Sequence, residues 1–313
     1  MEYISVKQAA DKWDTSVQIV RRFCRQDRIT GAIQRNGAWL IPATARKPKR
    51  IEDIEEPEEL SPLAKTLLRQ KKKKNFHGLY DYVQTDFTYS SCRMASNRLT
   101  RGQVETIFKK GKVSVSFEPM KVSDLIEVLN HCVCVDYILD HIEEPLSAKF
   151  IKNLHYQLTF GTVDERKKKV TPGQFRTRNS QRKESFILPS DYVSDKLKLL
   201  TTRYESLEEV DRRDILDFHV RFERIFPFED YNGRVGRLIM FKECLRLDVM
   251  PCVLDDKRRT RYLEGLREWD NDSSILAEVV MEAQSRFDAQ IQLQMLAEHR
   301  QSFQMIGFTE DEL

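Results

Sequence analysis

The chain of 313 residues has no long apolar run and little cysteine. No run approaches the roughly 18 apolar residues that a membrane span needs, which argues against a membrane protein. The first residues, Met-Glu-Tyr-Ile-Ser, lack the basic start and the apolar stretch of a secretory signal. Six scattered cysteines in a chain of this size are typical of reduced thiols in the cytosol. We therefore expect a cytoplasmic protein with no membrane partner.

Hydrophobic residues make up 40% and charged residues 32% of the sequence. This composition excludes collagen-like, mucin-like and wholly disordered chains, and it predicts a soluble globular protein with a highly charged surface. At about 150 residues per domain, the length predicts two domains.

The formal net charge of +3 hides an uneven distribution along the chain. Residues 1–50 contain eleven Lys/Arg and four Asp/Glu, a net charge of +7, whereas residues 51–60 carry −6 and the remainder carries +2. We therefore predict a basic head at 1–50, a charged linker at 51–75 and a body at 76–313. Such asymmetry points to nucleic-acid binding by the head. A merely solvated charged surface is the alternative.

The basic head has the pattern of two short helices followed by a hairpin. Apolar residues recur at helical spacing in 6–13 and again in 17–24. Asn36-Gly37 lies between two apolar runs, which is a strong hairpin signal. This order predicts a winged helix-turn-helix whose second helix contacts DNA phosphates or enters a groove. The candidate DNA-binding residues are Arg21, Arg22, Arg25 and Arg28.

The head also resembles known DNA-binding segments. The stretches I-S-V-K-Q-A-A-D-K-W, R-I-T-G-A-I and W-L-I-P-A are similar to the heads of excisionase-like and MerR-like proteins. The resemblance implies DNA as the partner of residues 1–50. A small protein-binding helical module is the alternative.

The body is mainly helical by the period of its apolar residues, and one short segment is the exception. The apolar face predicted for one of these helices consists of Leu125, Val128, Leu129, Cys132 and Val133. Residues 175–188 have an extended pattern, which predicts a short β-hairpin flap. The expected fold class is therefore mainly α: a helical bundle with this flap, the winged head and further helices at the C-terminal end.

His131-Cys132-Val133-Cys134 superficially suggests metal ligation. The close spacing lies within a helical stripe, and the second Cys/His pair that a zinc site needs is absent from the sequence. We therefore expect these side chains to pack in the core.

The stretch 217–237 combines an apolar helix, a sharp turn and a second helix. Pro227 ends the first helix, and Arg234 and Arg237 lie in the first turn of the second. Two arginines are unusual there, because a helix N-terminus is already partially positive. They become favourable when an anion sits on the exposed backbone N–H groups between the guanidiniums. The predicted phosphate site comprises Asn232, Gly233, Arg234 and Arg237.

Asp230 precedes this helix and is placed to hold a Mg²⁺ ion that bridges the bound phosphate. An ordinary turn between helices, with its arginines paired to acids elsewhere, is the alternative interpretation of the whole stretch.

The same stretch resembles the core motif of the Fic family, H-x-F-x-D/E-G-N-G/K-R-x-x-R, whose members typically transfer AMP from ATP to a protein hydroxyl. Residues 227–237 align with the motif without a gap. Residues 80–91 resemble the start of the domain in clostridial-type members, and Gln174-Phe175-Arg176-Thr177 resembles the flap that aligns the target segment. The resemblance implies a Fic-type bundle, ATP with Mg²⁺ as cofactors, and a protein target at the flap.

Three positions depart from the family pattern. The catalytic histidine, which takes the proton of the target hydroxyl, falls on Phe226, and phenylalanine has no proton acceptor. The glycine of the anion-binding turn falls on Tyr231, whose side chain restricts the backbone and crowds the phosphates. The inhibitory motif S/T-x-x-x-E-G/N runs from Ser91 to Ser96, with Ala95 in place of its glutamate. The catalytic base and its restraint are therefore both absent.

Two residues offer a replacement for the lost chemistry. His219 precedes Phe226 by two helical turns, roughly 10 Å along the axis, and matches a histidine that related members carry beside the catalytic one. We therefore expect it to be a packing residue. Self-modification of Tyr231 is the second alternative.

Three functions are compatible with these features. The first is a pseudoenzyme that binds nucleotide or protein through the body and DNA through the head. The second is a transferase that moves a different group from another phosphate-containing donor. The third is a transcriptional or scaffolding protein whose body serves homodimerisation. We favour the first, in which AMP transfer is absent or very weak.

Overall fold

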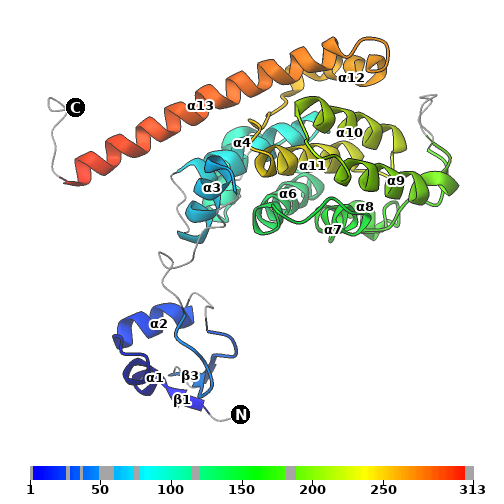
Figure 1. Ribbon diagram of the computed structural model, residues 1–313. Helices are drawn as coiled ribbons and strands as arrows, with labels where there is room; N and C mark the ends of the chain where they lie inside the picture. The colour runs from blue at the N-terminus through cyan, green and yellow to red at the C-terminus, as the bar shows by residue number, and fades with distance from the viewer. Residues whose placement is uncertain are drawn as a thin grey trace. The chain divides into compact units, whose positions relative to one another are not determined.

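The computed structural model describes residues 3–25, 29–35, 38–48, 60–73, 78–113, 120–180 and 188–306 (Figure 1). Within these ranges, the side chains of Arg22, Arg25 and residues 298–306 are not described. The chain forms two compact units, Met1–Glu56 and Pro57–Leu313, which are considered separately.

The first unit consists of two short helices and a three-stranded antiparallel sheet. The elements are β1 (Tyr3–Ser5), α1 (Val6–Lys12), α2 (Val17–Arg25), β2 (Ile33–Arg35) and β3 (Ala38–Pro42), with the strand order β1-β3-β2. Helix α1 begins after Ser5 because Ser5 and Gln8 form a reciprocal capping box. The predicted hairpin is present as β2 paired with β3, and its turn Asn36-Gly37 lies outside the described residues.

The first unit has a hydrophobic core of its own. Its buried members are Ala9, Ala10, Trp13, Val20, Phe23, Cys24, Ile29 and Ile41. Strand β1 was not expected from the sequence, and it pairs with β3 so that Ile4 lies opposite Ile41. These residues thus form a hydrophobic core within the first unit.

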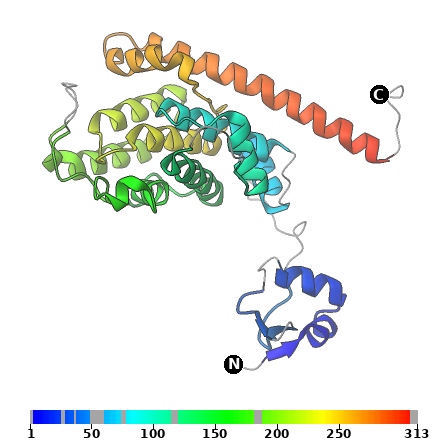
Figure 2. The ribbon, with the colours of Figure 1, turned by 180° about the vertical axis from the view of Figure 1, so that it is seen from behind.

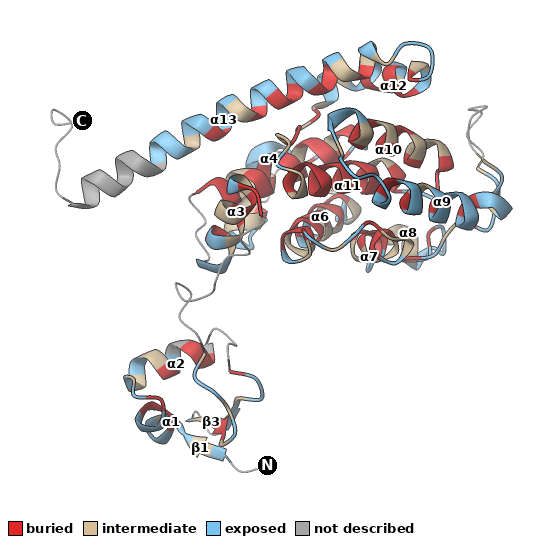
Figure 3. Ribbon diagram, in the orientation of Figure 1, coloured by how far each residue is buried: buried red, intermediate tan, exposed pale blue. Residues whose placement is uncertain are grey.

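The second unit is helical, as predicted. Its α-helices are α3 (Pro62–Lys73), α4 (Leu79–Met94), α5 (Arg101–Lys110), α6 (Val122–Asp140), α7 (Ala148–Thr159), α8 (Val163–Arg166), α9 (Val193–Glu205), α10 (Arg212–Ile225), α11 (Asn232–Arg246), α12 (Arg259–Glu268) and α13 (Ser274–Ile306), with 3-10 helices η2 (Ser190–Tyr192) and η3 (Asp256–Arg258). Helix α11 is central: it contacts α3, α4, α6, α7 and α10, and it is buried along nearly its whole length (Figure 3).

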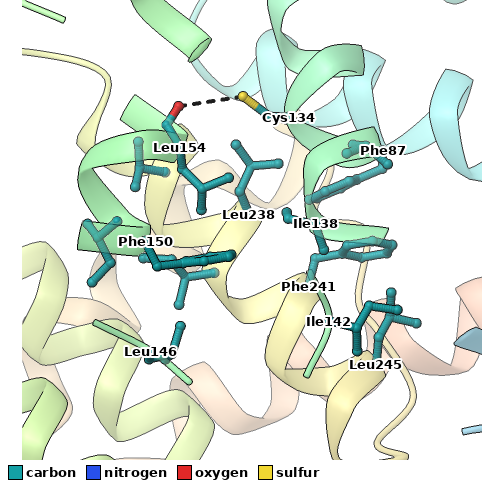
Figure 4. Packing of buried hydrophobic residues seen from close by; sticks show 14 of the residues in the cluster. Phe87, Cys134, Ile138, Ile142, Leu146, Phe150, Leu154, Leu238, Phe241 and Leu245 are labelled. Carbon is teal, nitrogen blue, oxygen red and sulfur yellow. Dashed lines mark hydrogen bonds between the residues drawn. The ribbon is translucent and has the colours of Figure 1, made fainter. Parts of the chain in front are cut away.

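The main core lies between α11 and the helices α4, α6 and α7 (Figure 4). The rings of Phe87 on α4 and Phe241 on α11 stack with their centroids 4.6 Å apart. Ile138 on α6 and Phe150 on α7 are fully buried in the same cluster. Each such side chain contributes roughly 1.5–3 kcal/mol by leaving water. This packing fixes α11, and with it the loop that precedes α11.

A second hydrophobic cluster joins α10 and α11 to α12 and α13. Gly265 on α12 permits a close approach of α13, because a Cβ atom there would lie 2.8 Å from the backbone nitrogen and Cα of Leu276. Helix α13 lies along one side of the helical body in both views (Figures 1 and 2). Among the described residues, no helix is both long and apolar enough to cross a membrane.

All six cysteines are buried, and none forms a disulfide. His131 and Cys134 are inaccessible to solvent, and Cys132 is only 8% exposed. His131, Cys132 and Cys134 therefore pack in the core as predicted, whereas Val133 does not.

The structure differs from the sequence-based expectation at the linker and in the described part of the flap. The linker is shorter than 51–75, because residues 62–73 form α3, and its Ala64 and Leu67 are buried in the main core. The flap hairpin is also absent from the part that is described, since residues 171–180 contain no strand. Residues 181–187 of the flap lie outside the described residues.

The apolar face predicted for α6 was also wrong in part. Leu129 and Val133 are 44% and 50% exposed, whereas the polar residues Asp124, Glu127 and His131 are buried. Hydrophobic periodicity assigns charged side chains to solvent, but Glu127 is buried because it pairs with an arginine of α11.

Candidate functional site

The loop at residues 226–231 joins α10 to α11 and carries most of the predicted site. Asn232, at the start of α11, holds this loop in shape. Its Oδ1 accepts a hydrogen bond from the Phe228 backbone N–H, and its Nδ2 donates to the Phe228 carbonyl oxygen, both at 2.9 Å. The Phe228 ring stacks on His155 of α7, with ring centroids 3.8 Å apart. The Asn232 side chain therefore stabilises the loop, whereas the sequence predicted that it contacts a phosphate.

Two residues of the loop adopt the left-handed backbone conformation that favours glycine. Phe226 ends α10 with a φ of 50°, and Tyr231 precedes α11 with a φ of 68°. The left-handed conformation costs a non-glycine residue roughly 1–2 kcal/mol. At Tyr231 this cost is offset by packing, because the ring is buried and lies 3.7 Å beneath the Arg234 guanidinium carbon.

Arg234 is buried, and its charge is already balanced by protein carboxylates. Its Nη1 donates to Glu127 Oε1 on α6 at 2.7 Å, and its Nη2 lies 3.6 Å from Asp230 Oδ1. Burial alone lowers the pKa of Arg234, but the carboxylates of Glu127 and Asp230 outweigh burial and raise the pKa above its ordinary value. The alternative interpretation of the sequence, arginines paired to acids elsewhere, thus applies to Arg234.

Arg237 contacts the C-terminal end of α4. Its Nη2 donates to the Ser91 carbonyl oxygen at 2.8 Å, and its Nε donates to Ser91 Oγ at 3.2 Å. Ala95 caps α4, and Ser96 follows with a φ of 71°. The predicted inhibitory segment therefore lies against the second motif arginine, and Ser91 makes the contact to it.

A cavity of about 260 Å³ lies at the N-terminus of α11. Ala95 and Ser96 line it from the end of α4, and Phe226 lines it from the end of α10. Asp230 and residues 231–234 and 237 complete the part that the sequence predicted. Neither Ser91 nor the flap residues are among the described residues that line it.

The described part of the flap is bound to the loop by Arg176, which is 3% exposed. Its Nε donates to the Phe226 carbonyl oxygen at 2.6 Å, and its backbone N–H donates to the Pro227 carbonyl oxygen at 2.9 Å. Phe175 packs against Phe228, with ring centroids 5.7 Å apart. Arg176 thus anchors the flap, whereas its neighbours Gln174 and Thr177 are exposed.

His219 and Tyr231, the two residues considered as replacements for the catalytic base, are both buried and hydrogen-bonded. His219 is buried, its Nε2 lies 2.6 Å from the Tyr262 hydroxyl, and burial lowers its pKa to about 3. The pKa of the Tyr231 hydroxyl is raised by burial, and this hydroxyl donates to Asp164 Oδ2 at 3.3 Å. Both groups are therefore neutral at pH 7 and held by packing.

Asp230 fits a magnesium ion only together with a phosphate group. Its exposed carboxylate already accepts the Tyr231 backbone N–H at 2.6 Å through Oδ1. In the described part of the chain, no three Cys, His, Asp or Glu side chains cluster as metal ligands. Magnesium in phosphate sites needs only one or two carboxylates, because the substrate phosphates supply the other ligands. Asp230 suits that arrangement as the single protein ligand.

The candidate DNA-binding arginines lie in the first unit. Arg21 is on α2 and exposed. Arg22 and Arg25 belong to α2, but their side chains are not described, and Arg28 lies outside the described residues.

Nothing in the sequence indicated that Glu127 on α6 and three residues of α12 belong to the site. Arg259, Tyr262 and Leu266 line the cavity from α12, and the Arg259 Nε donates to the Met94 carbonyl oxygen at 3.2 Å. No local motif marks these residues, because they lie more than twenty residues from the loop along the chain. Tyr262 and Leu266 are four positions apart, which indicates that they lie on the same face of a helix. The spacing does not indicate which part of the protein that face contacts.

Several solved structures share the fold of the chain. A Fic-domain-containing signaling protein from Bacteroides thetaiotaomicron has a TM-score of 0.59 and 20% identity, covering 74% of this chain and 94% of that one. A structure of Fic-1 from C. elegans has a TM-score of 0.58 and 17% identity, covering 75% and 72%. A Fic family protein from Desulfovibrio desulfuricans has a TM-score of 0.50 and 20% identity, covering 78% of each chain.

At these identities the structural likeness establishes the fold alone. A search of curated proteins finds no match. Residues 145–244, which run from just before α7 into α11 and include the whole loop, match the model of the Fic/DOC family. The chain therefore contains a Fic/DOC domain, built on the Fic fold.

Proposed function

We propose that the protein is a nucleotide-binding Fic-fold pseudoenzyme that does not transfer AMP. The observation that carries this proposal is Phe226, which is buried at the end of α10 in the wall of the cavity. The Fic motif has its catalytic histidine at this position. A phenyl ring accepts no proton, so the target hydroxyl is not activated from this position.

Among the described residues that line the cavity, no histidine takes the place of the missing base. His219 of α10 is bound instead to Tyr262, with its Nε2 2.6 Å from the Tyr262 hydroxyl. Its pKa of about 3 makes His219 a weak base at pH 7.

Nucleotide binding is supported by the cationic groups around the cavity. Arg237 and Arg259 line it, and the first backbone N–H groups of α11 point from a helix N-terminus, which favours anions. Tyr262 and Leu266 offer an apolar wall against which a base packs. Asp230 would hold the Mg²⁺ ion of a bound nucleotide, and that ion would neutralise phosphate charge.

Incorporation of AMP from labelled ATP tests the loss of catalysis. We expect none with the unaltered protein, either into itself or into proteins of a cell lysate. The Phe226→His, Tyr231→Gly double variant restores a base and a glycine and is expected to incorporate label. Phe160→His is the matched control, because Phe160 is 56% exposed on the end of α7 and lies outside the cavity lining. Robust transfer by the unaltered protein would overturn the proposal, and a mass adduct from another nucleotide or nucleotide-sugar donor would favour altered transferase chemistry.

We further propose that the first unit binds DNA as a winged helix-turn-helix. Its support is a separately packed unit with two helices and a hairpin, together with a net charge of +7 in residues 1–50. The full chain is expected to bind duplex DNA with an affinity that falls steeply as salt rises.

Fluorescence anisotropy with labelled duplex DNA tests this second proposal. Arg21→Glu on α2 is expected to weaken binding several-fold, because a phosphate contact is replaced by repulsion. Arg213→Glu makes the same charge change on the exposed start of α10 and is expected to have little effect. Equal losses from the two variants would show that only overall charge matters.

A further inference from the structure

We propose that the cavity beside α11 accepts a nucleoside monophosphate in preference to a nucleoside triphosphate. The inference rests on the proposed nucleotide-binding function and names the class of nucleotide. It follows from the charge balance of the cavity, from the cover over Arg234 and from the cavity's size.

The charges around the cavity cancel. Its lining contains the guanidiniums of Arg234, Arg237 and Arg259 and the carboxylates of Glu223 and Asp230. Glu127 adds a third carboxylate directly behind Arg234, at 2.7 Å from Nη1. Three positive groups are thus balanced by three negative ones. Such a site offers much less attraction to a triphosphate than two unpaired motif arginines would offer.

Tyr231 covers the face of Arg234. The tyrosine ring lies 3.7 Å from the guanidinium carbon, is only 5% exposed, and is held by its hydroxyl on Asp164. A phosphate group that approached this face would have to displace the ring. The phosphates that a triphosphate adds would therefore meet the Tyr231 ring and a guanidinium already paired with Glu127.

The remaining groups suit one phosphate and one base. A single phosphate fits the N-terminus of α11 beside Arg237 and Arg259, whose guanidiniums donate to Ser91 and to the Met94 carbonyl oxygen. Phe226, Tyr262 and Leu266 supply a wall of aromatic and apolar atoms. The volume of about 260 Å³ lies at the lower limit of the roughly 300–1,000 Å³ that is typical of small-molecule pockets, which favours the smaller nucleotide.

Calorimetric titration of the full chain with adenosine, AMP and ATP·Mg²⁺ tests the preference. We expect AMP to bind at least tenfold more tightly than ATP·Mg²⁺ and also more tightly than adenosine. ATP·Mg²⁺ binding as tightly as AMP would overturn the preference and leave nucleotide binding in place. Adenosine binding as tightly as AMP would overturn the phosphate site. No binding of any of the three would overturn both this inference and the proposed function.

Glu127→Gln tests the counter-charge itself. The variant removes the charge behind Arg234 and is expected to raise the affinity for ATP·Mg²⁺ about tenfold relative to AMP. Glu105→Gln is the matched control, because it removes one charge from the ion pairs with Arg101 and Lys109 on α5, outside the cavity lining. An unchanged ratio in a folded Glu127→Gln protein would contradict the proposed role. A thermal unfolding transition in each variant establishes that the variant is folded. The ratio of AMP affinity to ATP·Mg²⁺ affinity, measured on the unaltered chain, decides the preference independently of the variants.

Discussion

Lowering the pH from 7 to 5 is expected to reduce the free energy of unfolding by about 6 kcal/mol, because three buried histidines must stay neutral. His131, His155 and His219 are at most 2% exposed. Burial lowers the pKa of each from 6.5 to about 3. Each imidazole is held within the core, as His155 is by the Gly173 backbone N–H that donates to its Nδ1 at 3.0 Å.

The direction of this effect follows from proton binding. Between pH 6.5 and pH 3 the unfolded chain binds a proton at each of these histidines and the folded chain does not. Stability is therefore fully present above pH 6.5 and falls as the pH drops through this window. About 6 kcal/mol is a large share of the 5–15 kcal/mol by which domains are stable.

Urea unfolding curves at pH 7.5, 6.0 and 5.0 measure this dependence. His155→Gln keeps a hydrogen-bond acceptor for Gly173 without a titrating ring and is expected to remove about one third of the pH dependence. His141→Gln is the control, because this imidazole is only half-buried at the end of α6. An unfolding free energy that is the same at pH 7.5 and pH 5.0 would contradict the prediction.

Arg234→Met is expected to destabilise the body by roughly 3–5 kcal/mol, because it leaves the Glu127 carboxylate buried without its partner. Both side chains of this pair are 9% exposed. Adding Glu127→Gln is expected to recover at least half of the loss, since the second substitution removes the unpaired charge.

A double-mutant cycle by chemical denaturation gives the coupling energy of the pair. Arg213→Met at the exposed start of α10 is the control and is expected to change stability by less than about 0.5 kcal/mol. A loss of under about 1 kcal/mol for Arg234→Met, or no recovery in the double variant, would show that the ion pair does not hold the site together.

Much of the fold was predictable because it depends on local patterns. Ser5 and Gln8 mark the start of α1 through side-chain capping, and Pro227 ends α10 within two residues of the predicted point. The left-handed φ of Tyr231 agrees with a position that suits glycine. The linker and the face of α6 were predicted wrongly, because both depend on packing partners distant in sequence.

The candidate site was predictable only as a set of residues. The sequence places Asn232, Arg234 and Arg237 at the start of a helix, but it does not show what they contact. Asn232 binds the Phe228 backbone, and Arg237 binds Ser91, 146 residues away along the chain. The sequence therefore could not show that these side chains already make contacts within the protein.

The sequence alone determined that this protein has a basic head, a helical body and a loop that resembles the Fic motif. These properties follow from composition, from helical periodicity and from a contiguous motif. Only the tertiary structure decided that the site is charge-balanced, because Glu127 lies 107 residues from Arg234 in the chain and 2.7 Å from it in space. A buried ion pair depends on how α6 packs against α11, and no pattern within either helix specifies that contact.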